Sequence, residues 1–531
     1  MTLSDDILDD IILQIGGIGK YQFVVIICIS LVMLLHSAAH ISYVFTSMDS
    51  EYRCLVPECE ATIAADPDWL RNVIPSDVSM YDGTSKCLMY ERLNVLWDIG
   101  YNCSIDDFDK NSTKHCPLFY FYDDEYYIGR EFNLLCEDNL WKLSLVGTTN
   151  TFGMFLGMIV TGFISDRYGR KSLLLFGMAG CGVVGLIKTL SPSFIWFLIF
   201  ELIEAILSAG TCCCVFIMAV ELVIPSKRAL MGTILNSVYS LGEVLVALVA
   251  WSCRSWKLLI YYIYGPCVML ILLYYILPES IRWMLSKGRI EESKEALRNI
   301  ATVNKKNLSE ETLNKLDHIK PCKENTHKFS MILNSPRLRW RFFNCCFAWL
   351  TCAFLFYGIT LNSVRLYGNK YSDFILISLT ELPAYWSCNF LVEKLGRRRS
   401  IYGSYFLTCI ACLCFIPITK SSGWLHLFIY CMGKMGATAA FYVIYVITSE
   451  LFPTPLRHTV MGLSSTVGRL GSLTSPQIPL LSRIWEPLPL LMFAAMSFAA
   501  GIASLFFPET KGITLPDTIE EAEEIQNKTS K

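Results

Sequence analysis

Two residues of opposite charge lie inside long apolar stretches of the C-terminal half of the sequence. Glu381 stands close to Pro383, and Arg469 lies between Gly468 and Gly471. A carboxylate can hold an ammonium group, and the planar guanidinium of arginine suits a carboxylate. Together the two residues predict a site for a zwitterion, with the ammonium at Glu381 and the carboxylate at Arg469. The alternative for each is a structural ion pair, with another buried charge or with each other; for Glu381 it is also a protonated, hydrogen-bonded acid.

Four further charged residues lie in apolar stretches, where an unpaired charge is costly. Glu201 and Glu204 are three residues apart and therefore share one face of a helix. Glu243 and Lys434 each stand alone. All four are candidates for coupling to protons or sodium, between which the sequence does not choose. A structural ion pair is the interpretation that we favour for each of them.

Aromatic and amide side chains are candidates to shape such a site. Trp349, Phe356 and Tyr357 lie on one stretch, and their rings can make cation–π contacts with an ammonium group. Many aromatic residues of membrane proteins simply face lipid, which is the alternative for these three. Asn150 offers a polar contact, although the glycines that follow it fit helix packing equally well.

The composition indicates which elements must position these residues. Of 531 residues, 53% are hydrophobic and 17% are charged, whereas a soluble chain carries about a quarter charged residues. This excludes a disordered chain, a coiled coil and most soluble enzymes. The formal net charge of −2 excludes a broad basic surface for nucleic acid. The sequence shows no Ser/His/Asp arrangement, phosphate-binding loop or spaced metal cluster. We therefore expect a polytopic membrane protein that is not an enzyme and has no cofactor, metal or nucleic-acid partner.

Apolar runs long enough to cross about 30 Å of hydrocarbon predict an all-α membrane protein with twelve transmembrane helices in two six-helix halves. The first six runs lie near 21–45, 142–164, 172–190, 194–220, 229–251 and 256–277, and the second six near 342–361, 373–392, 400–418, 424–449, 458–482 and 487–507. The predicted organisation is an N-terminal segment (1–20), a first half (21–278) with a large loop (46–141), a central loop (279–341), a second half (342–507) and a tail (508–531).

The large loop carries the signals of an oxidising compartment. It holds Cys54, Cys59, Cys87, Cys103, Cys116 and Cys136, and two glycosylation sequons at Asn102 and Asn111. Six cysteines allow up to three disulfides in fifteen connectivities, among which the sequence does not choose. Between Asp49 and Leu140, 7 Lys/Arg and 19 Asp/Glu give a net charge of 7 − 19 = −12.

Charge also predicts orientation. The stretch 281–341 holds 14 Lys/Arg and 7 Asp/Glu, a net of 14 − 7 = +7. Basic residues in the short loops after the second, fourth and eighth spans fall on the same side if spans alternate. By the positive-inside rule this side is cytoplasmic. Both termini are then cytoplasmic, and the large loop with its disulfides and sequons is extracellular.

Three motifs recur at nearly one offset, which indicates an internal duplication. Asp166-Arg-Tyr-Gly-Arg-Lys171 returns as Glu393-Lys-Leu-Gly-Arg-Arg398, Glu221 with Arg228 returns as Glu450 with Arg457, and Leu277-Pro-Glu-Ser280 returns as Phe507-Pro-Glu-Thr510. Duplicated halves place a binding site between them and allow them to rock about it.

These repeated charges predict ion pairs on the cytoplasmic face that latch one conformation and release in another. The alternative is that they only fix the topology. The predicted latch residues are Asp166, Arg167, Gly169, Arg170, Glu221, Arg228, Glu393, Arg397, Glu450 and Arg457.

The sequence resembles the major facilitator superfamily, through its loop signature Gly162-Phe-Ile-Ser-Asp-Arg-Tyr-Gly-Arg-Lys171. Within it, the chain is most similar to the organic cation, zwitterion and anion transporter family. Supporting stretches are Glu131-Phe-Asn-Leu-Leu-Cys136, Pro278-Glu-Ser-Ile-Arg-Trp-Met-Leu285, Thr448-Ser-Glu-Leu-Phe-Pro-Thr454, Pro508-Glu-Thr-Lys-Gly512 and Leu515-Pro-Asp-Thr518. The resemblance covers essentially the whole chain and implies transport of small organic ions across the plasma membrane.

The branch of the family is indicated by two residues. Glu381-Leu-Pro-Ala-Tyr385 resembles the cation and carnitine-type branches, where the acid contacts the cationic group. Ser465 to Pro476 resembles the carnitine-type and anion branches, where the arginine, here Arg469, is associated with a substrate carboxylate. The pure cation branch has an acid near this point, whereas the neighbour of Arg469 in this chain is Gly468. The resemblance therefore implies a carnitine-like or amine-derived substrate.

Two other functions remain open from the sequence. An organic anion exchanger would use Arg469 and would not need Glu381. A receptor would bind a ligand through the large loop without transporting it. The coupling ion and the oligomeric state are not predicted.

Overall fold

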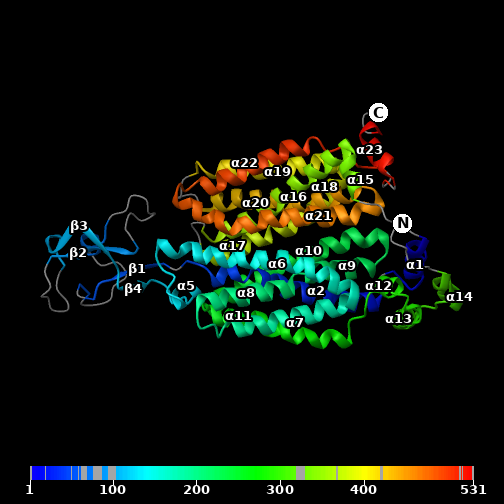
Figure 1. Cartoon of the computed structure of the whole chain (residues 1–531), viewed down its shortest axis with the longest axis horizontal. Coiled ribbons are helices and arrows are strands. Elements are labelled where there is room, and N and C mark those ends of the chain that lie inside the picture. The colour runs from blue at the N-terminus through cyan, green and yellow to red at the C-terminus, as the bar shows by residue number, and fades with distance from the viewer. Residues whose placement is uncertain are drawn as a thin grey trace.

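The computed structural model describes residues 3–17, 19–49, 51–57, 59–60, 69–75, 86–93, 103–318, 329–365, 369–418, 423–513, 516 and 518–528. It is an elongated bundle of roughly parallel and antiparallel helices with a small β-containing domain at one end (Figure 1). Both termini lie at the other end. We call these the loop end and the termini end.

The first half consists of helices that bury one another's apolar faces. They are α2 (Lys20–Ile41) with the short α3 (Tyr43–Thr46), α6 (Leu140–Tyr168), α7 (Arg170–Lys188), α8 (Phe194–Ser208) with α9 (Thr211–Glu221), α10 (Arg228–Cys253), and α11 (Trp256–Met269) with the 3₁₀ helix η4 (Leu270–Tyr275).

The second half repeats this arrangement. It consists of α16 (Pro336–Asn362), α17 (Lys370–Leu379) with α18 (Glu381–Leu395), α19 (Arg397–Phe415), α20 (Gly423–Leu451), α21 (Thr454–Thr474) with the 3₁₀ helix η7 (Ser475–Arg483), and α22 (Leu488–Ser504). In Figure 1 the two halves form two layers, with α6, α10 and α17 between them. Each half has its own large apolar core.

The expected number of membrane-crossing segments agrees with this bundle. Among the described residues, nine helical segments are long and apolar enough to cross a membrane. α19, α21 and α22 run beside them and complete the second half (Figure 1). α19 begins with three arginines, and α22 has 17 residues. The chain is therefore a twelve-helix membrane protein of two six-helix halves.

The eighth span is broken next to the predicted site. α17 ends at Leu379 and α18 begins at Glu381. Pro383 has no backbone N–H to donate to the carbonyl of Leu379, so the hydrogen-bond ladder is interrupted there. Thr380, between the two helices, keeps a helical backbone, so the span continues past Glu381 with a local irregularity at this point.

Two glycines allow the tight turns that begin α7 and α19. Gly169 has φ = +96° and Gly396 has φ = +92°, a region that side chains other than glycine rarely adopt. A Cβ at Gly169 would collide with the carboxylate of Glu279, and a Cβ at Gly396 with that of Glu509. The recurrence of glycine in the duplicated motif therefore has two physical causes.

The large loop forms a small domain with two antiparallel two-stranded sheets. β1 (Tyr52–Leu55) pairs with β4 (Leu118–Phe121), and β2 (Leu88–Arg92) pairs with β3 (Phe108–His115). Two short helices complete it: α4 (Leu70–Val73) and α5 (Ile128–Glu131). Three disulfides hold it together: Cys54–Cys116, Cys59–Cys103 and Cys87–Cys136. The six loop cysteines therefore pair with one another.

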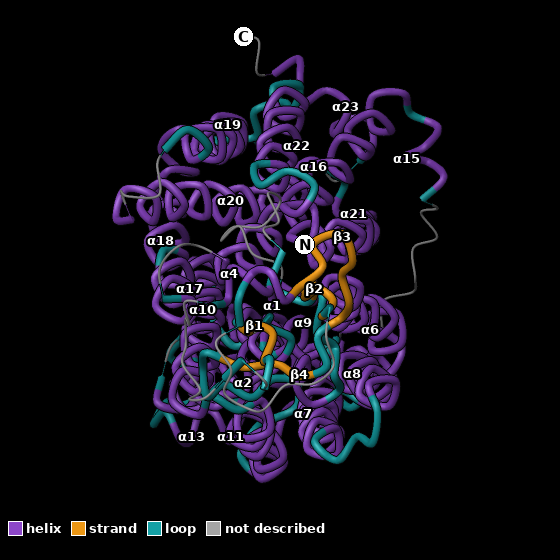
Figure 2. Tube along the Cα trace, turned by 90° about the vertical axis from the view of Figure 1, so that its left-hand side faces the viewer, coloured by secondary structure: helices purple, strands orange, loops and turns teal. Residues whose placement is uncertain are grey.

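Short helices cover the termini end. They are α1 (Leu3–Gln14), α12 (Ile281–Ser286), α13 (Ile290–Val303), α14 (Glu310–Asn314), α15 (Ser330–Asn334) and α23 (Ile519–Lys528). Leu8, Ile11 and Ile12 of α1 pack against Trp283 and Leu297 in a separate apolar cluster. Figure 2 views the bundle from the loop end, with the strands of the loop domain toward the viewer, and these helices lie at the opposite end, which Figure 1 shows from the side.

Candidate functional site

A buried ion pair occupies the middle of the second half. Lys434 Nζ on α20 lies 2.7 Å from Glu381 Oε1 on α18, and both side chains are 0% exposed. The ammonium also donates to Thr360 Oγ1 at 2.7 Å and to the Phe356 carbonyl at 3.3 Å. It lies 3.4 Å from the centre of the Phe356 ring. Lys434 is thus the partner of Glu381 in this structure, and Phe356 already contacts a cation.

The first half contributes to the same place. Ser240 Oγ on α10 donates a 2.5 Å hydrogen bond to Glu381 Oε2, across the interface between the halves. Glu243, one helical turn further along α10, is 0% exposed and interacts electrostatically with Glu381 and Lys434. Two carboxyl groups from different halves therefore lie within electrostatic reach of Lys434, and Glu381 is the one that forms an ion pair with it among the described residues.

Arg469 lies on α21 beside this cluster without a counter-ion. It is half-buried and interacts electrostatically with Tyr357 and Tyr445. Within the described part of the chain no carboxylate forms an ion pair with it. Its flanking glycines let α21 approach α16 closely, because a Cβ at Gly468 would lie 3.2 Å from the Trp349 carbonyl oxygen. The pair between Arg469 and Glu381 that the sequence left open is not formed, since Glu381 pairs with Lys434.

The predicted aromatic residues lie around these charges. Trp349 donates from Nε1 to Thr448 Oγ1 at 2.9 Å, and its ring meets Tyr445 edge-on at 4.4 Å. Phe356 and Tyr357 are in edge-to-face contact, with ring centres 5.2 Å apart. All three therefore face the interior of the protein and not lipid.

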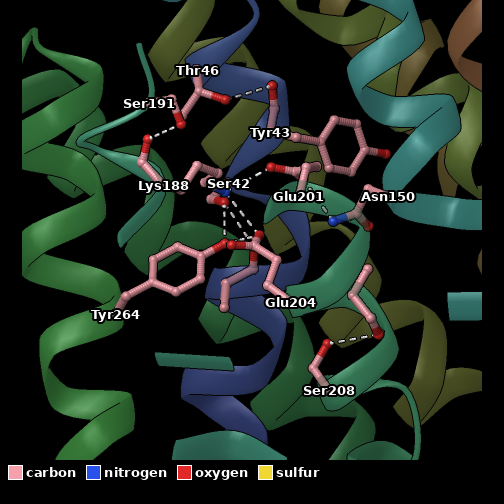
Figure 3. Close-up of polar contacts among 12 residues, drawn as sticks. Ser42, Tyr43, Thr46, Asn150, Lys188, Ser191, Glu201, Glu204, Ser208 and Tyr264 are labelled. Carbon is pink, nitrogen blue, oxygen red and sulfur yellow. Dashed lines mark hydrogen bonds and ion pairs between the residues drawn. The ribbon is translucent and has the colours of Figure 1, made fainter. Parts of the chain in front are cut away.

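A second buried cluster lies wholly within the first half (Figure 3). Lys188 Nζ lies 2.6 Å from Glu201 Oε2 and 2.9 Å from Glu204 Oε1. Asn150 donates to Glu201 at 2.8 Å, and Tyr264 donates to Glu204 at 2.6 Å. Glu201 and Glu204 therefore form the structural ion pairs that the sequence analysis favoured, and Asn150 serves this network in the structure.

Each half carries a matching set of charges at the termini end. In the first half, Arg170 Nη2 lies 3.8 Å from Glu221 Oε1, and Ser280 donates a hydrogen bond to Glu221. Glu279 accepts hydrogen bonds from the backbone N–H groups of Arg170 and Lys171 at 2.9 and 3.1 Å. Glu279 thereby caps the positive end of α7.

The second half repeats the set with a shorter ion pair. Arg397 Nη2 lies 2.8 Å from Glu450 Oε1, and Arg397 Nε lies 3.0 Å from Glu450 Oε2. Thr510 donates a hydrogen bond to Glu450. Glu509 accepts from the N–H groups of Arg397 and Arg398 at 2.8 and 3.2 Å. These contacts join helices within one half.

The other predicted latch residues differ from these two sets in their partners and in their exposure. Arg228 bonds Asp9 of α1 at 2.7 Å, so its partner comes from the N-terminal segment and not from the neighbouring span. Asp166, Arg167 and Glu393 are exposed at the termini end, and the structure shows no ion pair for them within the described ranges. Arg457 is half-buried.

The two halves contact each other at the loop end. Lys370 on α17 forms an ion pair with Glu125. Tyr371 donates to the same carboxylate at 2.8 Å, and its hydroxyl lies 2.5 Å from that of Tyr127. Pro476 packs where a Cβ of Gly147 would stand. Polar and apolar contacts thus close the interface between the halves on this side.

The glycosylation sequons fall on the loop domain. Asn111 lies in β3 and is exposed. Asn102 lies outside the described residues.

Sequence reasoning missed several residues of these clusters. Lys188 lies within a predicted span, and a charged residue at such a position was the signal that could have identified it as a partner of Glu201 and Glu204. Glu279 and Glu509 recur at a common offset in the motif that indicated duplication, which was a signal for a shared role. Ser240 carries no charge, and nothing in the sequence pointed to its contact with Glu381.

Two pseudo-symmetric six-helix halves with buried charges between them define a membrane transporter. The fold agrees with solved structures. The partially occluded, inward-open xylose transporter XylE from E. coli matches 93% of this chain and 100% of its own with a TM-score of 0.61 at 16% identity. XylE bound to 6-bromo-6-deoxy-D-glucose matches 96% of this chain and 100% of its own with a TM-score of 0.59 at 17% identity.

The sequence comparisons give the family. The pattern of the sugar (and other) transporter family matches residues 91–522. Solute carrier family 22 member 1 of Bos taurus is 29% identical over 98% of this chain and 93% of its own. Solute carrier family 22 member 3 of Mus musculus is 30% identical over 75% of this chain and 72% of its own. The organic cation transporter protein of Drosophila melanogaster is 28% identical over 98% of this chain and 95% of its own.

The chain belongs to the sugar transporter family of the major facilitator superfamily, with solute carrier family 22 proteins as its relatives. It is a multi-pass membrane transporter of small organic ions and not an enzyme.

Proposed function

We propose that this protein moves small organic cations and zwitterions, of the carnitine-like or amine-derived kind, across the plasma membrane by alternating access. The observation that carries the proposal is the charge balance between the halves. Glu243 and Glu381 face Lys434, which balances one of them; with Arg469 left for the carboxylate of the substrate, one negative charge remains for its cationic group. Burying that charge alone would be costly, and a substrate ammonium offsets it.

Arg469 supplies the second point of recognition. It is the half-buried cation next to this cluster and has no carboxylate partner in the described structure. A guanidinium holds a carboxylate with two parallel hydrogen bonds. A zwitterion would therefore place its ammonium near Glu381 and Glu243 and its carboxylate at Arg469.

The aromatic residues suit an alkylated ammonium, which has few or no N–H donors and binds through its charge and methyl groups. Phe356 holds the Lys434 ammonium over its ring at 3.4 Å, which supports the aromatic rings of this region as binding surfaces for a cation. Tyr357 lies next to it and beside Arg469. A quaternary ammonium would use the same kind of cation–π contact.

The alternating movement follows from where the halves touch. Contacts between halves close the loop end through Glu125, Lys370 and Tyr371. Opening this end requires those contacts to break, while the termini end closes. The two sets around Arg170 and Arg397 keep each half rigid during the movement, and the exposed Asp166 and Glu393 become partners of the opposite half when the termini end closes.

The orientation that we propose has both termini in the cytoplasm and the disulfide-bonded loop outside the cell. The basic central loop supports the first assignment. The three disulfides and the exposed Asn111 support the second, because both modifications belong to the secretory route.

Uptake of radiolabelled substrates by cells tests this function. A quaternary cation, a carnitine-like zwitterion and an aryl carboxylate would be compared for the wild type, Glu381→Gln and Arg469→Ala, with and without sodium. Glu295→Gln, at an exposed position on α13, serves as a control for acid removal, and surface expression is measured for each variant. We expect saturable zwitterion uptake that Glu381→Gln strongly reduces and that Arg469→Ala lowers about tenfold to a hundredfold. Zwitterion uptake that survives Glu381→Gln would contradict the site, and ligand binding without saturable flux would indicate a receptor.

An organic anion exchanger is the second candidate, since Arg469 has no anionic partner among the described residues. It predicts aryl carboxylate uptake that persists in Glu381→Gln and is lost in Arg469→Ala.

A further inference from the structure

Glu243 is a buried carboxyl group without the partners that a carboxylate needs. Its side chain is 0% exposed, and in the described structure neither oxygen accepts a hydrogen bond of good geometry. It lies on α10, which packs against α2 of its own half and against α17 and α18 of the other half. An ionised carboxylate in such a place would lose its hydration without compensation.

The charged groups around Glu243 come from both halves. Its strongest electrostatic interactions are with Glu381 on α18 and Lys434 on α20. The tyrosines that face it are Tyr239 on its own helix, Tyr43 next to α2, Tyr357 on α16 and Tyr385 on α18. His36 and His40 on α2, Cys212 on α9 and Asp373 on α17 are further titratable groups on the elements packed against α10, and Arg469 interacts with both histidines and Cys212.

Lys434 is the group in this cluster that must keep its charge. Its ammonium meets Glu381 at 2.7 Å, Thr360 at 2.7 Å and the Phe356 ring at 3.4 Å. One ammonium balances one carboxylate. With Glu381 ionised and paired, Glu243 is the carboxyl group left over, and binding a proton removes its charge.

We infer that Glu243 and Glu381 form a carboxyl pair that binds one proton in the substrate-free protein, and that a cationic substrate releases this proton when it binds. In the present arrangement of the halves, Ser240 donates a hydrogen bond to Glu381 across their interface. In that arrangement the proton is held between the two carboxyl groups. A cation arriving beside the pair supplies the missing positive charge, so both carboxyl groups can ionise and the proton leaves to water. The protein would then exchange protons for organic cations. The exchange rests on the proposed function, whereas the proton in the substrate-free protein does not.

Infrared spectroscopy tests the proton itself without any substrate. A protonated carboxyl group has a C=O stretching band that is separate from those of carboxylates and amides. We expect the band to be present in the purified wild type at neutral pH, to decrease in Glu243→Gln and to be lost on titration to high pH. A wild-type spectrum unchanged by pH, or the same band in Glu243→Gln, would overturn the inference. Because Glu201 and Glu204 also share one lysine, the same titration is run on Glu204→Gln, in which a pH-sensitive band must persist; this comparison decides even if Glu243→Gln does not fold.

Proton release tests the exchange. Tetraethylammonium would be added to the purified wild type in weak buffer, and the release measured with a pH indicator. We expect about one proton for each bound cation, and binding that weakens about tenfold for each unit by which the pH falls below the range in which the pair titrates. In Glu243→Gln the release disappears and the binding no longer changes with pH.

A matched control comes from the other buried cluster. Glu204 also shares a lysine with a second acid, but it lies within one half. Glu204→Gln should keep the pH dependence of tetraethylammonium binding and its proton release. Binding without release in the wild type would overturn the exchange, as would equal loss of release in Glu204→Gln. Absence of any tetraethylammonium binding would contradict the proposed function, and the infrared result would still decide on the proton.

Discussion

Ser240 of the first half donates a 2.5 Å hydrogen bond to Glu381 of the second half. The contact joins α10 to α18 at the break in the eighth span, where Pro383 interrupts the helix. It places the acid on which the substrate proposal rests at the interface that must rearrange during transport. Groups at such an interface have two sets of neighbours in the two conformations, which is what a transport site requires.

Removal of Lys434 tests whether the cluster is balanced as described. Lys434→Gln leaves Glu381 buried without its counter-ion. Breaking a buried pair in this way costs about 3–5 kcal/mol, so we expect a clear loss of folded protein at the cell surface. The double variant Glu381→Gln/Lys434→Gln removes both charges and should restore much of the expression without restoring uptake. Equal surface expression of the single variant and the wild type, by surface biotinylation, would contradict the ion pair.

The two halves offer a matched comparison at the termini end. Arg397 bonds Glu450 at 2.8 Å, whereas Arg170 lies 3.8 Å from Glu221. Arg397→Ala removes charge-assisted hydrogen bonds, each worth about 1.5–3 kcal/mol, and should lower the thermal stability of the purified protein more than Arg170→Ala does. Thermal unfolding of both variants in the same detergent measures this. A larger loss in Arg170→Ala would mean that the shorter pair is not the stronger one.

Glycine at the start of α7 is required by backbone conformation and by space. Gly169 has φ = +96°, and a Cβ there would collide with Glu279. Gly169→Ala should therefore cost about 1 kcal/mol or more from the backbone, with the collision in addition, and should reduce surface expression. Gly162, seven residues earlier in the same motif, has nothing within 4 Å of an added Cβ. Gly162→Ala is the control and should express like the wild type.

The sequons test the orientation of the chain. Asn111 is exposed on the disulfide-bonded loop domain, and the sequon asparagine Asn307 is exposed near α13 at the opposite end. If the loop domain is extracellular, Asn111→Gln lowers the mass of the glycosylated protein on a gel, and Asn307→Gln leaves it unchanged. The reverse pattern would place the termini outside the cell.

Much of the fold was predictable because membrane spans impose a simple pattern. Apolar runs and the recurring motifs indicated two six-helix halves, and the structure confirms them. The eighth span illustrates both the reach and the limit of this reasoning. The helix is interrupted only at Thr380, whose backbone stays helical, and this interruption lies beside the Pro383 visible in the sequence, whereas no pattern indicated that Glu381 there meets Ser240 and Lys434.

The partners of the charged residues were less predictable, since partners come from distant parts of the chain. The identity of the counter-ion of Glu381 depends on how α18 and α20 pack, and the spacing of Glu381 and Arg469 contained no information on Lys434. Arg228 bonds Asp9 because α1 folds back onto the termini end, which no span pattern indicates. The sequence could propose charged candidates, and only the packing shows which of them meet.

The most direct test of the two-charge site compares a substrate with its own analogue. Uptake would be measured for a carnitine-like zwitterion and for its carboxamide, which keeps the quaternary ammonium but has no carboxylate. In the wild type, uptake of the zwitterion should exceed uptake of the carboxamide. Arg469→Ala should lower this ratio about tenfold to a hundredfold, which is the cost of a lost charge-assisted hydrogen bond. Glu381→Gln should reduce uptake of both compounds. If Arg469→Ala lowered uptake of both equally, or if Glu381→Gln spared the carboxamide, the assignment of ammonium to Glu381 and carboxylate to Arg469 would be wrong.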